Sequence, residues 1–208
     1  MLVRMIRIRP AEAADARAIA QVRAQTWRTA YAGVIPDQTL ADLTAPEAVR
    51  REAQWRAEHS MDGLLIAEAP APDATAPDAT AAPDAKAPEA AAPDAAEIIG
   101  FTAFGPERGE EDRPDQPQPD PPDLDRAELY ALYVLPRHWC SGVGRALVDR
   151  ALALAAEAGY ADISLWVLEG NERGRRFYEQ AGFAGTGESA ALSRLGGVSG
   201  IRYRRLVG

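Results

Sequence analysis

A strand, a helix and a second strand follow one another between residues 127 and 169, and this order constrains the fold more than any other feature of the sequence. AELYALYV (127–134) is rich in apolar and aromatic residues, SGVGRALVDRALALAAEAG (141–159) has the composition of a helix, and ADISLWVLE (161–169) is again typical of a strand. A crossover of this kind makes the two strands parallel neighbours joined by a right-handed connection. The chain is therefore predicted to contain a sheet with at least one parallel pair.

The residues on either side of this unit predict further strands and helices around the same sheet. A helix is expected from Asp15, whose carboxylate can accept backbone N–H bonds as the cap. Further strands are predicted at 3–9, 64–69 and 97–105, with one or two more in the tail at 192–207, and further short helices at 36–43, 46–58 and 174–182. The predicted fold class is α/β of the α+β type, with a central, mixed but mostly antiparallel sheet flanked by helices.

Two stretches rich in proline and acidic residues interrupt this pattern. The segment at about 70–96 is a degenerate repeat of proline, acidic residues and alanine without a bulky apolar residue, so it cannot bury a core and we predict that it is disordered. The acidic, proline-rich loop at about 106–126 is interpreted in the same way. We expect a single domain over residues 1–208 that carries both as insertions. A docking or steering tail is the alternative interpretation of the first insert.

The charge and the cysteine content exclude several classes of protein. The formal net charge of -8 lies mainly in the two inserts, so the rest of the chain is close to neutral, and a nucleic-acid partner is not expected. No stretch approaches the ~20 apolar residues of a membrane span, and arginines occupy the place of a signal's apolar core, so we expect a cytoplasmic protein without a membrane partner. A single cysteine and two histidines provide neither a disulfide framework nor a Cys/His zinc site, and no metal is expected.

The turn PRHWCSGVGR, between the first strand of the unit and its helix, has the features of an anion-binding site. Gly142 and Gly144 lack side chains, so the backbone N–H groups of residues 140–145 can approach an anion at the positive end of the helix. The third glycine of a dinucleotide fingerprint and the GK[ST] of a nucleoside-triphosphate loop are both missing. The turn is interpreted as a phosphate cradle, with a merely tight structural turn as the alternative.

A second group of residues follows the second strand of the unit. Asn171 lies just after this strand, and Tyr178 lies seven residues further on, so that the two share one face of a helix. The alternative is structural, with Asn171 as a helix cap and Tyr178 as half-buried packing.

Together, LYALYVLPRHWCSGVGRAL and LWVLEGNERGRRFYEQAGF closely resemble the GNAT superfamily of N-acetyltransferases, and the hairpin and RIRPAEAADARAIAQVRAQTWRTAYAGVIP resemble it more loosely. The resemblance implies a GNAT fold in which the parallel strands ending at Val134 and near Leu168 splay apart around the pantetheine arm of acetyl-coenzyme A. It also implies transfer of the acetyl group to a primary amine by direct attack in a ternary complex. The acceptor would be a small molecule or a peptide, and a homodimer is compatible with the family. A non-catalytic sensor of acyl-coenzyme A is the alternative.

The resemblance also implies roles for individual residues. Glu128 and Tyr178 would be catalytic, and the acceptor would lie over Trp27 and Tyr31, two aromatic residues that are equally compatible with a core position. Cofactor binding is implied for Leu132, Tyr133, Val134, Cys140, Ser141, Gly142, Val143, Gly144, Arg145 and Asn171.

Three positions depart from the family pattern. Trp139 stands where an arginine or glutamine is common and cannot donate as an arginine does, so some phosphate affinity is expected to be missing. Cys140 stands at the next position, where members of the family often have a glycine. We interpret it as an inert small side chain, with an oxidant-sensitive thiol as the alternative. Gly174 stands where alanine is usual and is expected only to weaken the helix, by up to ~1 kcal/mol.

The implied reaction sets different demands on the two catalytic candidates. An alkylamine with a pKa of about 10.4 is neutral in only about one molecule in a few thousand at pH 7, a penalty of roughly 4.6 kcal/mol, so a base is useful. Glu128 is expected to act as that base through water, with a glutamate simply in water at a strand edge as the alternative. Tyr178 is expected to stabilise the leaving thiolate, and a backbone N–H near Val134 to polarise the thioester carbonyl.

Overall fold

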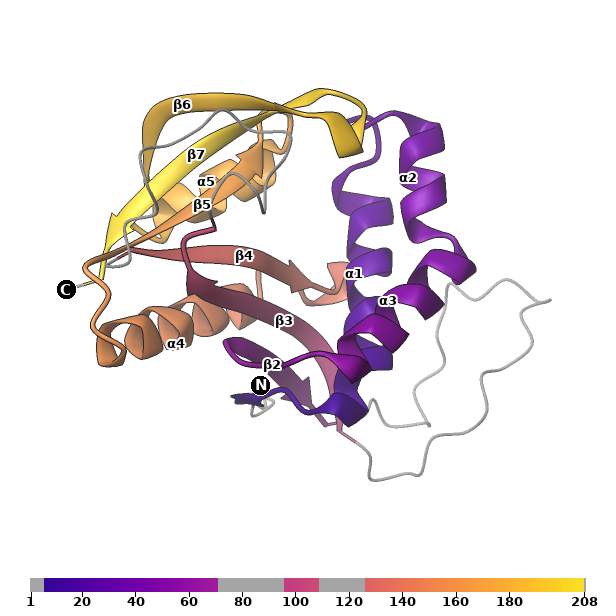
Figure 1. The fold of residues 1–208 in the computed structure, drawn as a ribbon, viewed down its shortest axis with the longest axis horizontal. Coiled ribbons are helices and arrows are strands. Elements are labelled where there is room, and N and C mark those ends of the chain that lie inside the picture. The colour runs from indigo at the N-terminus through magenta and orange to yellow at the C-terminus, as the bar shows by residue number, and fades with distance from the viewer. Residues whose placement is uncertain (1–5, 71–95, 109–125, 208) are drawn as a thin grey trace.

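The computed structural model describes residues 6–70, 96–108 and 126–207 (Figure 1). Nearly all of both predicted insertions lies outside these ranges. The strands are β1 Arg7–Pro10, β2 Leu64–Ala69, β3 Glu97–Pro106, β4 Arg126–Val134, β5 Asp162–Leu168, β6 Ala184–Leu192 and β7 Val198–Leu206. The α-helices are α1 Ala16–Ala30, α2 Asp37–Thr44, α3 Pro46–Glu58, α4 Val143–Glu157 and α5 Glu172–Gln180. None of these helices combines the length and the apolar composition that crossing a membrane requires.

The strands of the described residues form one sheet in the order β1-β2-β3-β4-β5-β7-β6. The predicted crossover is β4-α4-β5, and its two strands are parallel neighbours as expected. The other neighbours are antiparallel, including the predicted hairpin of β2 and β3, in which Ala69 lies opposite Glu97. The mixed, mostly antiparallel α/β sheet is therefore confirmed.

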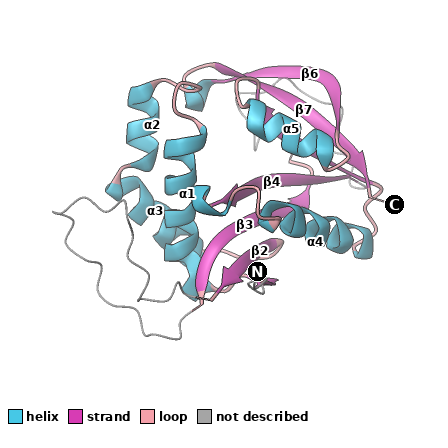
Figure 2. Cartoon of the chain, turned by 180° about the vertical axis from the view of Figure 1, so that it is seen from behind, coloured by secondary structure: helices cyan, strands magenta, loops and turns pink. Residues whose placement is uncertain are grey.

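Helices cover both faces of the sheet, as two neighbouring residues of β3 demonstrate. A Cβ at Gly100 would lie 3.4 Å from Cδ1 of Leu147 in α4, so this residue faces α4. Phe101 faces the other way, with its ring 5.3 Å from that of Tyr133 and 5.4 Å from the guanidinium carbon of Arg56 in α3. Figure 2 shows α4 and α5 in front of the sheet, whereas α1 packs on β3 and β4 from the other side.

The beginning of α1 differs from the prediction at Asp15. The helix begins at Ala16, but the Asp15 carboxylate makes no capping bond to it. Instead it accepts hydrogen bonds from the Arg9 guanidinium at 2.7 and 3.0 Å and from the backbone N–H of Glu12 at 2.8 Å. The bond from Arg9 holds the pKa of Asp15 below its usual value. The predicted cap is thus wrong, because an arginine on the preceding strand binds the carboxylate.

The parallel pair β4 and β5 separates after a short contact, and this separation positions the site. Only residues 126–128 of β4 pair with β5, although β4 continues along β3 to Val134 and β5 continues along β7 to Leu168. The β3–β4 register shifts between Ala103 and Phe104, which leaves Tyr130 of β4 as the extra residue of a bulge. A bulge bends a strand, so it accounts for the divergence that the family resemblance implied.

Candidate active site

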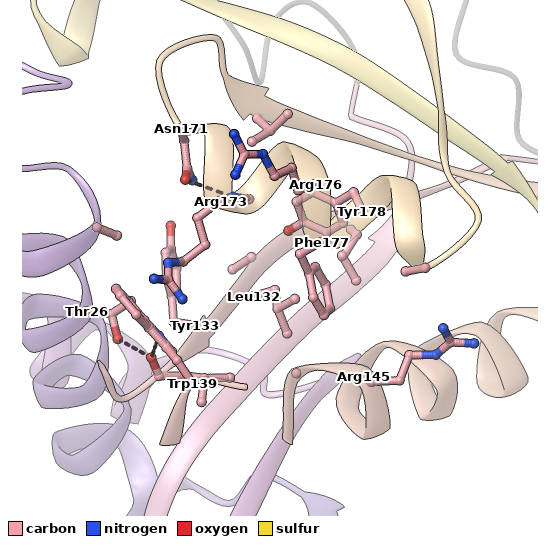
Figure 3. Close-up of a pocket in the computed structure, with 18 of the residues that line it drawn as sticks. Thr26, Leu132, Tyr133, Trp139, Arg145, Asn171, Arg173, Arg176, Phe177 and Tyr178 are labelled. Carbon is pink, nitrogen blue, oxygen red and sulfur yellow. Dashed lines mark hydrogen bonds between the residues drawn. The ribbon is translucent and has the colours of Figure 1, made fainter. Parts of the chain in front are cut away.

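A cavity of about 690 Å³ occupies the opening between the diverging strands (Figure 3). Its walls come from α1, β4, β5, the turn before α4, the first turn of α4, and α5. The residues proposed from the sequence that line it are Tyr31, Leu132, Tyr133, Val134, Cys140, Gly142, Gly144, Arg145, Asn171 and Tyr178. The two blocks on which the resemblance rests therefore meet at a single cavity.

The end of β4 presents backbone groups to this cavity. Leu135 donates its N–H to the carbonyl of Ile99 at 2.9 Å, and so points toward β3. In an antiparallel pair, consecutive residues direct their N–H and C=O groups to opposite sides. Leu132 and Val134 therefore point away from β3, toward the side from which β5 has diverged. These are the groups that an amide-containing ligand can pair with in the manner of an added strand.

The carbonyl of Val134 already has two donors. The indole Nε1 of Trp139 lies 2.7 Å from this oxygen, and the hydroxyl of Thr26 in α1 lies 3.1 Å from it. Trp139 therefore anchors the turn to the end of β4, a role that the sequence did not predict. The groups left for a ligand are the N–H of Val134 and the N–H and C=O of Leu132.

The first turn of α4 provides a second set of backbone donors. Gly142 precedes the helix with φ +88°, and no side chain caps the helix end. Cys140 has φ +60°, which is unusual for a residue with a Cβ. The side chains of Ser141 and Val143 do not line the cavity in the described structure, since the Ser141 hydroxyl donates to the His138 carbonyl and Val143 is buried. An anion here would meet the amide groups at the positive end of α4.

Asn171 caps α5 and also lines the cavity. Its Oδ1 accepts the N–H of Gly174 at 3.0 Å, so the capping alternative is confirmed. A Cβ on residue 174 would lie only 2.6 Å from Nδ2 of Asn171. Gly174 is therefore not merely a weak helix former, because its missing side chain makes room for the cap.

Tyr178 lies within a group of half-buried tyrosines that line the cavity. Burial raises the pKa of its phenol well above the ordinary value, and burial likewise raises the pKa of Tyr31 and Tyr133. The Tyr178 ring makes edge contacts with Phe177 at 5.3 Å and Phe183 at 5.7 Å. The hydroxyls are consequently protonated at neutral pH and can donate hydrogen bonds.

Glu128 is buried beside the cavity. The alternative interpretation, a glutamate exposed to water at a strand edge, is therefore wrong. Only 1% of its side chain is exposed, and its carboxylate accepts bonds from Nη2 of Arg108 at 2.6 Å and from the Arg108 backbone N–H at 3.2 Å. Glu128 is not among the described residues that line the cavity. Arg108 connects Glu128 to the cavity wall. The guanidinium carbon of Arg108 lies 4.4 Å from the ring centre of Tyr130, which lines the cavity.

The two aromatic residues expected at the acceptor lie at different depths. Tyr31 lines the cavity. Trp27 is buried behind it, with ring centres 5.1 Å from Tyr31 and 6.2 Å from Tyr133, and belongs to a second core cluster. Tyr31 thus forms part of the cavity wall, and Trp27 packs behind it.

Several lining residues were not singled out from the sequence: Thr26, Tyr130, Trp166, Arg173, Arg176 and Phe177. Arg173, Arg176 and Phe177 lie inside the segment LWVLEGNERGRRFYEQAGF, which begins at Leu165. Its helical spacing relative to Asn171 and Tyr178 could have predicted that they face the cavity. No sequence pattern could have predicted Thr26 and Trp166, because their positions in the cavity depend on how α1 and β5 pack against β4.

Comparisons with known proteins agree with this geometry. A family model described as "Acetyltransferase (GNAT) family" matches residues 52–183. "Uncharacterized N-acetyltransferase YuaI" of Bacillus subtilis is 27% identical over 167 residues, which are 80% of this chain and 74% of the relative. "Probable N-acetyltransferase Rv2775" of Mycobacterium tuberculosis is 26% identical over 196 residues, 93% of this chain and 88% of the relative. A crystal structure of the PaiA N-acetyltransferase of Thermoplasma acidophilum, in complex with coenzyme A, shares the fold at TM-score 0.57 and 19% identity, covering 95% of this chain and 98% of that one.

Proposed function

Because the chain belongs to the GNAT acetyltransferase family, we propose that it transfers the acetyl group of acetyl-coenzyme A to a primary amine by direct attack within a ternary complex. The observation that carries the proposal is the opening between β4 and β5, where the outward backbone groups of Leu132 and Val134 share one cavity with the uncapped end of α4. The acceptor is proposed to be a small molecule or a peptide. Cytoplasmic location, a homodimer and disorder of the insert stay predictions of the sequence.

The residues present fit acetyl-coenzyme A at both ends of the cavity. Leu132 offers one amide donor and one acceptor for the amides of the pantetheine arm, which leaves the N–H of Val134 for the thioester. The N–H groups at the start of α4 suit a diphosphate, and Gly142 and Gly144 keep side chains out of its way. Asn171 lines the wall opposite β4, from which its amide could contact the arm.

Bound acetyl-coenzyme A would supply an acyl group activated as a thioester. The N–H of Val134 is the proposed donor to the carbonyl oxygen, because its side of β4 has no neighbouring strand. Tyr178 is the proposed donor to the departing sulfur. Its raised pKa keeps the proton on the phenol, so Tyr178 acts through a hydrogen bond and is not required to ionise.

Glu128 is the proposed acceptor of the amine proton, through water. The Arg108 guanidinium donates to the carboxylate at 2.6 Å and holds it in place beside the cavity. A negative charge near the acceptor also favours the approach of an ammonium ion. This role matters most for strongly basic amines, since weakly basic amines arrive already neutral.

An assay of thiol release over a panel of amines tests the proposal. We expect release that depends on the acceptor and saturates with acetyl-coenzyme A, at a rate that differs among alkylamines, α-amines and peptides. Saturable binding of acetyl-coenzyme A with no amine-dependent release from any member of a broad panel would instead indicate the sensor.

A further inference from the structure

Among the described residues, three arginines line the cavity, and they differ in whether a carboxylate is paired with them. Nε of Arg145 lies 2.8 Å from the carboxylate of Asp149, and Nη2 of Arg176 lies 2.9 Å from the carboxylate of Glu172. Arg173 forms no ion pair with any residue that the structure describes. A guanidinium without an internal carboxylate keeps its full attraction for an external anion.

Arg173 is also held in a particular place. Its guanidinium carbon lies 4.4 Å from the ring centre of Trp139, and its Nη1 lies 3.9 Å from Sγ of Cys140. Figure 3 shows the side chain extending from α5 toward Trp139 on the other side of the opening. The cation therefore lies at the first residue of the cradle formed by residues 140–145.

Trp139 cannot itself contribute to anion binding, because its only polar group is already used. Its N–H donates to the carbonyl of Val134 at 2.7 Å, so the indole face is what remains available. A guanidinium stacked on an aromatic face keeps the N–H donors along its edge free, and the stacking reduces the freedom that it loses on binding a ligand.

From these contacts we infer that Arg173, held on the Trp139 ring, is the residue that supplies positive charge to the diphosphate of the coenzyme. The inference rests on the proposed function and adds to it a specific residue on α5. Arg173 then provides, from the opposite wall of the cavity, the phosphate affinity that Trp139 cannot provide. Arg173 binds and positions the coenzyme and takes no part in proton transfer.

The test is a calorimetric titration of the full chain and its Arg173→Met variant with coenzyme A, dephospho-coenzyme A and pantetheine. We expect the variant to bind coenzyme A and dephospho-coenzyme A about tenfold more weakly, which is about 1.4 kcal/mol, and to bind pantetheine unchanged. Arg150→Met is the matched control. It removes the same charge from an exposed residue of α4 that does not line the cavity in the described structure, and it should leave all three affinities unchanged.

Each other outcome overturns the inference in a recognisable way. Equal losses for coenzyme A and pantetheine would mean that Arg173 supports the fold or the arm, and a loss confined to coenzyme A would assign it to the 3′-phosphate. If the wild-type chain binds coenzyme A and Arg173→Met binds it equally well, the inference fails while the proposed function stands. If the wild-type chain binds none of the three ligands, it is the proposed function that fails.

A double variant tests whether Trp139 and Arg173 act as one unit. Trp139→Arg restores a cation on the turn, so in the Arg173→Met background it should raise the ratio of coenzyme A affinity to pantetheine affinity. The ratio is the readout because loss of the Trp139 bond to the Val134 carbonyl affects both ligands. No rise of this ratio in a variant that unfolds at the same temperature as Arg173→Met would contradict a charge-based role for this pair.

Discussion

Nη2 of Arg108 lies 2.6 Å from Oε1 of Glu128, and the glutamate side chain is only 1% exposed. A guanidinium that donates hydrogen bonds to a carboxylate restricts the orientations that the carboxylate can adopt. In the proposed reaction, this pair determines how a proton leaves the acceptor amine.

Replacing Glu128 by Gln should therefore lower kcat most for strongly basic amines. We expect a loss of about 10- to 100-fold for an alkylamine and a few-fold at most for an arylamine, because the latter needs no base at pH 7. Steady-state rates on a pair of amines of matched size measure the difference. Glu157→Gln, at an exposed position of α4, is the control. Equal losses on both amines would contradict a base role.

Replacing Tyr178 by Phe should reduce kcat by about 10- to 100-fold and leave the Kd of acetyl-coenzyme A nearly unchanged. The variant removes one hydrogen-bond donor from the sulfur and keeps the packing against Phe177 and Phe183. Because burial raises the pKa of Tyr178, any alkaline limb of the wild-type rate profile below about pH 10 should persist in the variant. Its disappearance would show that Tyr178 titrates during turnover. Tyr160→Phe, outside the lining residues, is the matched control.

Gly174→Ala should not give the gain in stability, up to ~1 kcal/mol, that the better helix propensity of alanine alone would give. The new Cβ would lie 2.6 Å from Nδ2 of Asn171 and displace the side chain that caps α5, and loss of a cap costs about 1 kcal/mol. Urea denaturation of Gly174→Ala, Asn171→Ala and the double variant measures the effect. The cap can be lost only once, so Gly174→Ala should add no further loss to that of Asn171→Ala in the double variant. A more stable Gly174→Ala would restore the simpler interpretation of this glycine.

Asp15→Asn should weaken the fold in a pH-dependent manner. Bonding to Arg9 lowers the pKa of Asp15 in the folded state, so the carboxylate stabilises the fold above its unfolded pKa of 3.8, and that contribution disappears as the pH falls through the folded pKa. We expect a difference of about 1–2 kcal/mol between wild type and variant at pH 7, which shrinks below pH 4. A difference that stays constant over this range would mean that the charge of Asp15 is irrelevant.

Replacing residues 70–96 by a four-residue turn should leave the Kd of acetyl-coenzyme A and kcat within a few-fold of wild type. Ala69 and Glu97 are partners across β2 and β3, so a short turn can connect them, and closing the smaller loop should stabilise the protein by about 1.7 kcal/mol. Loss of activity would show that the insert takes part in function.

How far the sequence predicted this molecule depends on how local each signal was. The β4-α4-β5 unit and the hairpin were predicted because the apolar pattern of each element lies within its own residues. Asp15 was assigned wrongly because the capping pattern is local, whereas its partner Arg9 reaches it from a neighbouring strand. The turn at Gly142 was placed correctly from its glycines.

The side-chain pairs of the site could not be obtained in this way. The contacts of Arg108 with Glu128 and of Arg173 with Trp139 join residues that lie far apart in the chain, and no spacing rule connects them. The Asn171–Gly174 contact is local. A glycine within a helix indicates only low helix propensity, however, and does not reveal that its missing Cβ makes room for the Asn171 cap.

Calorimetric titration with acetyl-coenzyme A, carried out on the wild-type chain and on Gly144→Leu, tests whether the opening between β4 and β5 binds the coenzyme. A Cβ at residue 144 would already lie 3.3 Å from the Phe177 ring, so the larger side chain should fill the start of the cavity. We predict one saturable site in the wild type, with a Kd in the range of about 1 μM to 1 mM, and at least tenfold weaker binding in the variant. No heat from the wild type at millimolar acetyl-coenzyme A, or equal binding by the two proteins, would contradict it.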